Sequence, residues 1–141
     1  MIDKMVVEKK LQELNRYLIE LEAVGKISWD ELNDSLAKQW QICHGLQLCI
    51  QTLIDIGNHI LAALGENQVE DYADIIDKLG EKNIIPLEFS RSIRGMAGLR
   101  NLLVHEYARL DLTKIYSVLQ NRLGDFHRYI EYIKRYLETT P

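Results

Sequence analysis

The stretch ICHGLQLCIQTLIDIGNHILAAL, residues 42–64, decides the fold of this chain. Apolar side chains cover most of the circumference of a helix drawn through it, which is typical of a helix that lies among other helices. Upstream of it, Ser28 and Glu31 have the spacing of a capping box, in which each side chain accepts a hydrogen bond from the other's backbone NH. We therefore predict one long central helix from Ser28 to Leu64, with Gly65 ending it.

Apolar residues at intervals of three and four predict further helices on both sides of this central helix. They indicate a first helix over Val7–Leu21, a short one over Tyr72–Leu79, and a fourth that begins at Pro86, which needs no backbone NH in a first turn. Asp111 is a natural N-cap for a last helix that continues through Ile133. The prediction is an all-α, up-and-down bundle of about five helices.

Length and composition exclude several classes of protein. A chain of 141 residues suits a single domain, residues 1–141, whose core needs neither disulfides nor a structural metal. Cys43 and Cys49 lie in one helical pattern without metal-ligand spacing, so we expect both to be reduced and buried. Neither a signal peptide nor a membrane span is visible, and we expect a cytoplasmic protein.

The net charge of −4 excludes a uniformly basic surface, so any contact with RNA must be local. Such a local cluster is formed by Arg91, Arg94, Arg100 and Arg109. We take Arg91 and Arg94 as candidate RNA contacts, although a solvated helix face would carry the same residue types.

Within this cluster, the stretch RNLLVHEY begins at Arg100 and places polar side chains where core packing does not require them. On an ideal helix each residue advances about 100°, so Tyr107 falls about 20° from Arg100. Asn101 and His105 lie on the same broad side of that helix. Small residues beside them, such as Gly98, would let another backbone approach closely. A second copy related by a two-fold axis is the simplest such partner, and we predict a homodimer.

The side chains on this face suit metal-free cleavage of RNA, which needs a base, an acid and positive charge at the phosphate. Two copies of His105 facing each other could divide the acid and base roles, because imidazole titrates near neutral pH. Arg100 would hold the phosphate with its planar fork, and Asn101 could orient the imidazole or the phosphate. Taken alone, this pattern is not specific, because His105 and Tyr107 would serve equally well as structural residues.

Asp55 and His59 are four residues apart in the central helix and can meet on one face. Such a pair could fix a histidine tautomer or anchor the central helix against the helix of Arg100. We assign Asp55 and His59 a supporting role rather than direct catalysis.

The stretch IRGMAGLRNLLVHEY resembles the HEPN-domain proteins, and specifically the HepT toxins of HepT/MntA pairs, long known as a domain of unknown function. It has the Arg-x4-His-x-Tyr pattern of that family as Arg100, His105 and Tyr107, with the polar residue after the arginine supplied by Asn101. LIDIGNHILA in the central helix and YSVLQNRLGDFHRYI in the last helix are also similar, so the resemblance covers nearly the whole chain.

The resemblance implies an all-helical dimer with metal-independent ribonuclease activity, the toxin of a type VII toxin–antitoxin system. It also implies a partner, a minimal nucleotidyltransferase antitoxin like MntA, which attaches AMP to the tyrosine of the motif, here Tyr107. An adenylyl group would place a negative phosphodiester and a bulky base beside Arg100 and so exclude RNA. No cofactor or metal is expected. The alternative is a non-catalytic helical subunit that docks onto a nucleotidyltransferase and supports it.

Overall fold

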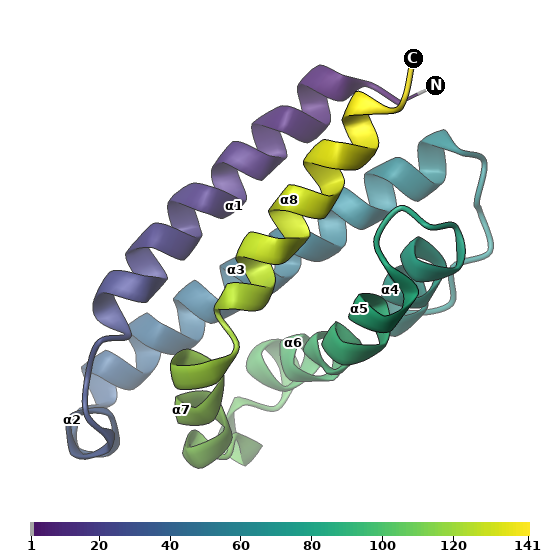
Figure 1. The fold of residues 1–141 in the computed structure, drawn as a ribbon. Coiled ribbons are helices and arrows are strands. Elements are labelled where there is room, and N and C mark those ends of the chain that lie inside the picture. Colours follow the sequence, from purple (N-terminus) through teal and green to yellow (C-terminus); the bar gives the residue numbers. More distant parts are fainter. Residues whose placement is uncertain (1) are drawn as a thin grey trace.

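The computed structural model describes residues 2–141, and these residues form eight α-helices and one short 3-10 helix. The elements are α1 (Lys4–Val24), α2 (Trp29–Asp34), α3 (Leu36–Ala63), α4 (Tyr72–Glu81), α5 (Leu87–Ile93), α6 (Gly95–His105), η1 (Tyr107–Arg109), α7 (Leu112–Asn121) and α8 (Gly124–Glu138). Since residues 2–141 contain no strand, the prediction of an all-α bundle is confirmed. Helices α1, α3 and α8 pack lengthwise against one another, and α4, α5 and α6 lie along another side of α3 (Figure 1).

Helix α3 is the central helix, as the opening stretch predicts, and it contacts α1, α2, α4, α6 and α8. Its buried apolar residues are Ile42, Cys43, Leu46, Cys49, Ile50, Leu53, Ile54, Ile56, Ile60 and Leu61. Each large aliphatic side chain buried in this way contributes about 1.5–3 kcal/mol to folding. The two cysteines are free thiols, as predicted. The buried Tyr129 hydroxyl of α8 donates to the Leu53 carbonyl at 2.9 Å, which joins the last helix to the central one.

The long helix predicted from Ser28 to Leu64 is interrupted, so that prediction was wrong in one place. Ser35 has an extended backbone, with φ −123° and ψ 108°, and its hydroxyl accepts from the backbone NH of Lys38 at 3.2 Å. Ser35 therefore ends α2 and caps α3, because its side chain supplies the acceptor that a helix N-terminus lacks. Gly65, with φ 83°, follows the end of α3 in the left-handed conformation expected of a helix stop.

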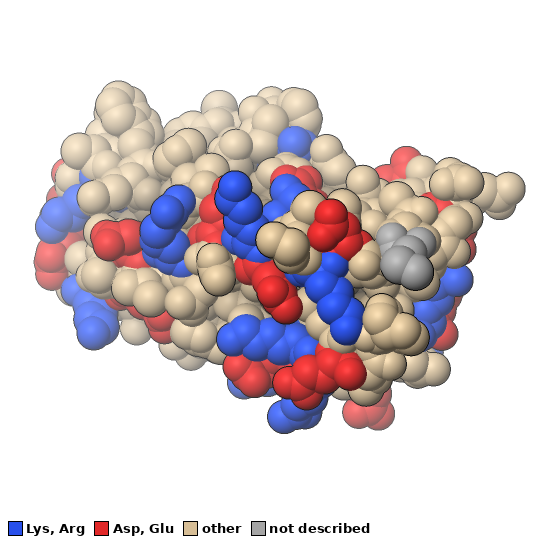
Figure 2. Space-filling model, turned by 90° about the horizontal axis from the view of Figure 1, so that it is seen from above, with Lys and Arg blue, Asp and Glu red and all other residues tan. Residues whose placement is uncertain are grey.

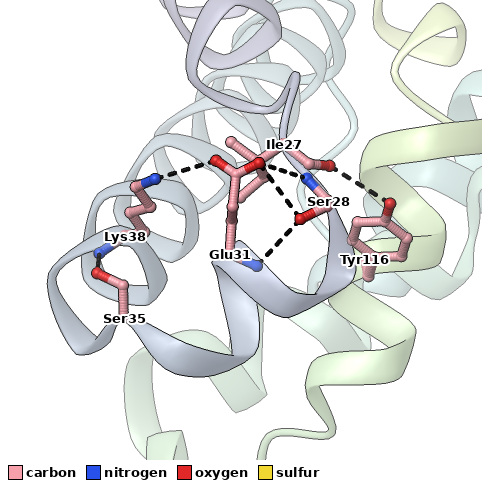
Figure 3. A network of polar contacts seen from close by, with 6 residues as sticks. All are labelled: Ile27, Ser28, Glu31, Ser35, Lys38 and Tyr116. Atoms are coloured by element: carbon pink, nitrogen blue, oxygen red, sulfur yellow. Dashed lines mark hydrogen bonds and ion pairs between the residues drawn. The ribbon is translucent and has the colours of Figure 1, made fainter.

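The predicted capping box is present at the start of α2 (Figure 3). The Ser28 hydroxyl accepts from the backbone NH of Glu31 at 3.1 Å, and the Ser28 NH donates to the Glu31 carboxylate at 3.4 Å. Lys38 of α3 bonds to the same carboxylate at 3.2 Å and spans the interruption. The Tyr116 hydroxyl of α7 donates to the Ile27 carbonyl at 3.3 Å, so the loop before α2 is joined to α7.

The last predicted helix is also divided, into α7 and α8. Asp111 caps α7 as predicted, accepting from the backbone NH of Thr113 at 3.0 Å. After α7, Arg122 leaves the helical conformation, and its Nε donates to the buried Asp125 carboxylate at 2.6 Å. Arg128 donates to the same carboxylate at 2.6 Å. A buried carboxylate needs such cationic partners, and the turn between α7 and α8 provides one of them.

Figure 2 shows the molecule from above, relative to the orientation of Figure 1. On this face, charged side chains of both signs are interspersed. This face has no extended field of one sign. Among the helices within residues 2–141, none combines the length and apolar character needed to cross a bilayer.

Candidate active site

Arg100, on the middle turn of α6, is held against the central helix. Its Nε atom donates to Oε1 of Gln51 in α3 at 2.7 Å. Its guanidinium carbon lies 4.6 Å from the centre of the Tyr72 ring at the start of α4, a cation–π distance. Three helices therefore fix one half-buried guanidinium, which is more restraint than a solvated surface arginine receives.

The outer part of the same guanidinium faces the other polar residues of the motif. Nη1 of Arg100 lies 3.4 Å from Nε2 of His105 and donates to the Asn101 side-chain oxygen at 3.3 Å. A guanidinium can only donate, so the contact with His105 is a hydrogen bond only when Nε2 carries its lone pair. In that state Nε2 of His105 is the nitrogen available as a base. The Asn101 side chain thus contacts the arginine, and within residues 2–141 no hydrogen bond joins it to the imidazole.

Tyr107 does not continue the helix of Arg100, so the helical-wheel position predicted for it was wrong. Glu106 leaves the helix with φ −134° and ψ 42°, and Tyr107 begins the 3-10 helix η1. The Tyr107 hydroxyl interacts with the Cys43 thiol of α3, and its side chain remains 39% exposed. Burial, together with the neighbouring Cys43, raises the pKa of Tyr107. Its hydroxyl is therefore neutral at physiological pH, while part of the residue remains exposed.

Asp55 and His59 are not paired with each other: among residues 2–141, no hydrogen bond joins these two side chains. Asp55 instead accepts from the Gln51 amide at 2.8 Å. Gln51 is not among the predicted site residues, although it precedes Asp55 by one helical turn and so lies on the same face of α3.

A hollow of about 590 Å³ lies beside the arginine. It is lined by Gln51, Ile54, Asp55, Asn58, Val69, Glu70, Asp71, Tyr72, Ile75 and Asn101. Three of these residues, Gln51, Tyr72 and Asn101, also contact Arg100 directly. The positively charged group therefore stands at the edge of a concave surface rather than on a flat one.

The two arginines predicted to contact RNA lie near the junction of α5 and α6. The predicted fourth helix is divided into α5 and α6, with Arg94 between them, and the Arg94 Nε lies 3.0 Å from both carboxylate oxygens of Asp77 in α4. Arg91 is exposed on α5. Within the part of the chain that the structure describes, no group of three or more His, Cys, Asp or Glu side chains is placed to hold a metal ion.

Comparison with known proteins gives consistent results for sequence and fold. A family model described as "Ribonuclease HepT-like" matches residues 8–133. The tRNA nuclease HepT of Aphanizomenon flos-aquae is 32% identical over 138 residues, which cover 98% of this chain and 94% of that protein. The mRNA nuclease HepT of Shewanella oneidensis is 36% identical over 89 residues, which cover 63% of this chain and 67% of that protein.

Solved structures share the arrangement of helices. The structure of a tri-AMPylated Shewanella oneidensis HEPN toxin in complex with an MNT antitoxin superposes with a TM-score of 0.84 at 28% identity. The match covers 96% of this chain and 99% of that one. YutE of Bacillus subtilis shares the fold with a TM-score of 0.82 at 21% identity, over 98% of this chain and 92% of that one.

The fold and the motif on α6 thus define an all-helical protein of the HEPN class. The chain belongs to the HepT-like ribonuclease family. This membership confirms the resemblance drawn from the motif, together with the predicted ribonuclease activity of the HepT toxin type.

Proposed function

We propose that two copies of this chain form a metal-independent ribonuclease, in which each copy supplies one Arg100 and one His105 to a shared cleft. The observation that carries the proposal is the contact between these residues. Arg100 is fixed by Gln51 and Tyr72, and it points its terminal nitrogen at His105, 3.4 Å away. A phosphate-binding group and an acid–base group are thus already assembled on one helix.

Each chemical step then has an assigned group. One His105 takes the proton of the ribose 2′-OH, whose oxygen attacks phosphorus to form a 2′,3′-cyclic phosphate. The bond from phosphorus to the 5′ oxygen breaks, and His105 of the second copy protonates that oxygen. The two Arg100 guanidiniums stabilise the additional negative charge on the phosphate. This division of roles requires two copies, because one imidazole cannot act as base and acid in the same step.

The surface around the motif supports pairing of two copies. Gly98 lies on α6, two residues before Arg100, and a Cβ added there would meet nothing within 4 Å. Val104 and Tyr107 add exposed apolar surface close to His105. We assign this face of α6 to the interface of a homodimer, with Arg91 and Arg94 at its edge in reach of the RNA backbone. Arg94 would exchange part of its contact with Asp77 for a phosphate.

RNA is the substrate class, supported by relatives that are named for cleavage of tRNA and of mRNA. We place the activity in the cytoplasm, where both of these RNAs occur. The chain acts there as a single helical domain, residues 1–141.

A nucleotidyltransferase antitoxin is the proposed regulator, supported by the structural match to an AMPylated HEPN toxin in complex with an MNT antitoxin. The Tyr107 oxygen would attack the α-phosphorus of ATP, forming the Tyr–O–P bond and releasing pyrophosphate. Because the pKa of Tyr107 is raised, the antitoxin must supply the base that removes the phenolic proton. The attached phosphodiester would then compete for Arg100 and repel RNA.

The purified chain, incubated with RNA in the presence of EDTA, tests the catalytic proposal. Cleavage by the unmodified chain, and its loss in both Arg100→Ala and His105→Ala, is the expected result. Equal cleavage by both variants would identify a contaminating nuclease and refute the proposal. Absence of cleavage by the unmodified chain, with intact binding to the nucleotidyltransferase, would instead support the alternative of a non-catalytic subunit.

A further inference from the structure

The Gln51 side chain joins two groups that the motif alone does not connect. Its Oε1 accepts from Nε of Arg100 at 2.7 Å, and its Nε2 donates to Oδ1 of Asp55 at 2.8 Å. Gln51 is half-buried on α3, while Asp55 is exposed one turn later on the same helix. A continuous path of hydrogen bonds therefore runs from Asp55 through Gln51 to the phosphate-binding arginine.

The chemistry of the three groups allows only one direction along this path. An amide has a donor end and an acceptor end, a carboxylate can only accept, and a guanidinium can only donate. If the Gln51 amide turned over, its NH2 group would face the guanidinium and its oxygen would face the carboxylate, so both hydrogen bonds would be lost. Asp55 thus holds the oxygen of Gln51 toward Arg100.

The same contacts leave Arg100 little freedom to rotate. The Nε–H direction is fixed by Gln51, and the guanidinium carbon lies over the Tyr72 ring, 4.6 Å from its centre. The terminal nitrogens then face outward, where Nη1 meets Asn101 and His105. Since a planar fork recognises phosphate through the direction of its N–H bonds, its orientation matters as much as its charge.

We propose that Gln51, oriented by Asp55, is a positioning residue that aims the guanidinium of Arg100 at the scissile phosphate. This inference rests on the proposed ribonuclease function. Asp55 acts on the reaction only through Gln51, which replaces the predicted pairing of Asp55 with His59. Gln51 itself touches neither the RNA nor the reacting atoms.

The principal test is Gln51→Leu, which keeps the size of the side chain and removes the acceptor. Loss of correct positioning lowers cleavage by about 10²-fold. The loss is expected mainly in kcat, because the arginine acts on charge that develops in the transition state. Gln41→Leu, the same change at an exposed position of α3, is the matched control and should leave kcat and KM unaltered.

Gln51→Glu separates positioning from simple packing. Its carboxylate still accepts from Nε of Arg100, so the variant should recover most of the kcat that Gln51→Leu loses. It also neutralises part of the positive charge, so KM for RNA should rise. If Gln51 only filled space, Gln51→Glu would show no recovery of kcat over Gln51→Leu.

Two pairwise combinations test the path itself. Asp55→Ala, which removes the acceptor of the Gln51 amide, should lower kcat, and the double variant with Gln51→Leu should be no worse than Gln51→Leu alone, because Asp55 acts only through Gln51. Likewise, Gln51→Leu should cost little when added to Arg100→Lys, which has no Nε–H to be oriented. Additive losses in either combination would overturn the proposal.

A measurement without RNA keeps the two proposals distinguishable. In the NMR spectrum of the unmodified chain, the Nε–H of Arg100 should give a sharp, slowly exchanging resonance that is assigned by its loss in Arg100→Lys. This resonance should broaden or move in Gln51→Leu and in Asp55→Ala, but not in Gln41→Leu. An unchanged resonance would overturn the positioning role even if the chain cleaves RNA. If the resonance changes in these variants but the unmodified chain never cleaves RNA, only the ribonuclease function is refuted. Asp55 is exposed, so Asp55→Ala remains informative if Gln51→Leu does not fold.

Discussion

Nη1 of Arg100 lies 3.4 Å from Nε2 of His105, within a single turn and a half of one helix. An entering phosphate would accept from the same Nη1 atom, because it offers a negatively charged acceptor in place of a neutral one. The lone pair of His105 would then be released beside the RNA. In the proposed mechanism, substrate binding and preparation of the base would thus be coupled through a single nitrogen atom.

The first prediction concerns the shape of the cation at position 100. Arg100→Lys keeps the positive charge but loses the Nε donor to Gln51 and the planar group that stacks on Tyr72. We expect cleavage to fall by about 10²-fold, the cost of a misplaced catalytic group. Initial rates on labelled RNA in EDTA measure this fall. Activity equal to that of the unmodified chain would show that charge alone suffices.

The second prediction separates regulation from catalysis. Tyr107→Phe removes the phenolic oxygen that would accept AMP but keeps the ring beside Cys43. The variant should cleave RNA at nearly the rate of the unmodified chain, and co-expression of the nucleotidyltransferase should no longer neutralise it. Intact-mass spectrometry should find AMP on the unmodified chain and none on the variant. Neutralisation of Tyr107→Phe by AMP attached elsewhere would contradict the assignment.

The third prediction concerns the proposed subunit interface on α6. Because a Cβ at Gly98 meets nothing within 4 Å, Gly98→Ala should stabilise the chain by about 0.5–1 kcal/mol, the usual difference between alanine and glycine in a helix. Gly98→Leu should fold equally well but hold two copies apart. Analytical ultracentrifugation should show dimers of the unmodified chain and monomers of Gly98→Leu, with cleavage lost in parallel. A Gly98→Leu variant that stays dimeric would move the interface elsewhere.

The fourth prediction concerns pH and the start of α7. Hydrogen bonds from Thr113 hold the pKa of Asp111 below its ordinary value of 3.8. A carboxyl whose pKa is lowered by folding stabilises the fold at pH values above its ordinary, unfolded-state pKa. This contribution is lost as the pH falls through the lower, folded-state pKa. Asp111→Asn keeps an N-cap oxygen but not the charge. The difference in urea midpoint between Asp111→Asn and the unmodified chain should therefore be present at neutral pH and vanish in strong acid. A difference that persists in acid would contradict a charge effect.

Much of the fold follows from local rules that the sequence displays directly. The apolar circumference of α3, the capping box at Ser28 and the N-cap at Asp111 depend on residues a few positions apart, and all three are confirmed. The interruptions at Ser35 and Arg122 were missed because helical spacing continues across them. Ser35 is held extended by its own cap, and Arg122 is drawn to the buried Asp125, which a helical pattern does not reveal.

The site divides in the same way. The spacing from Arg100 to His105 predicts that both lie on one helix, and they are in contact. Tyr107 departs from that helix because the backbone of Glu106 leaves the helical conformation. Cys43, which contacts Tyr107, is more than sixty residues away in the chain. Gln51 reaches Arg100 only because α3 and α6 pack together, so no local pattern could have paired them.

The hydrogen bond between Gln51 and Arg100 extends the proposed site beyond the motif RNLLVHEY, residues 100–107. A copy with every letter of RNLLVHEY intact could still have lost its toxicity through one change in α3. Harmless members of this family would then be sought by inspecting position 51 as well as the signature itself.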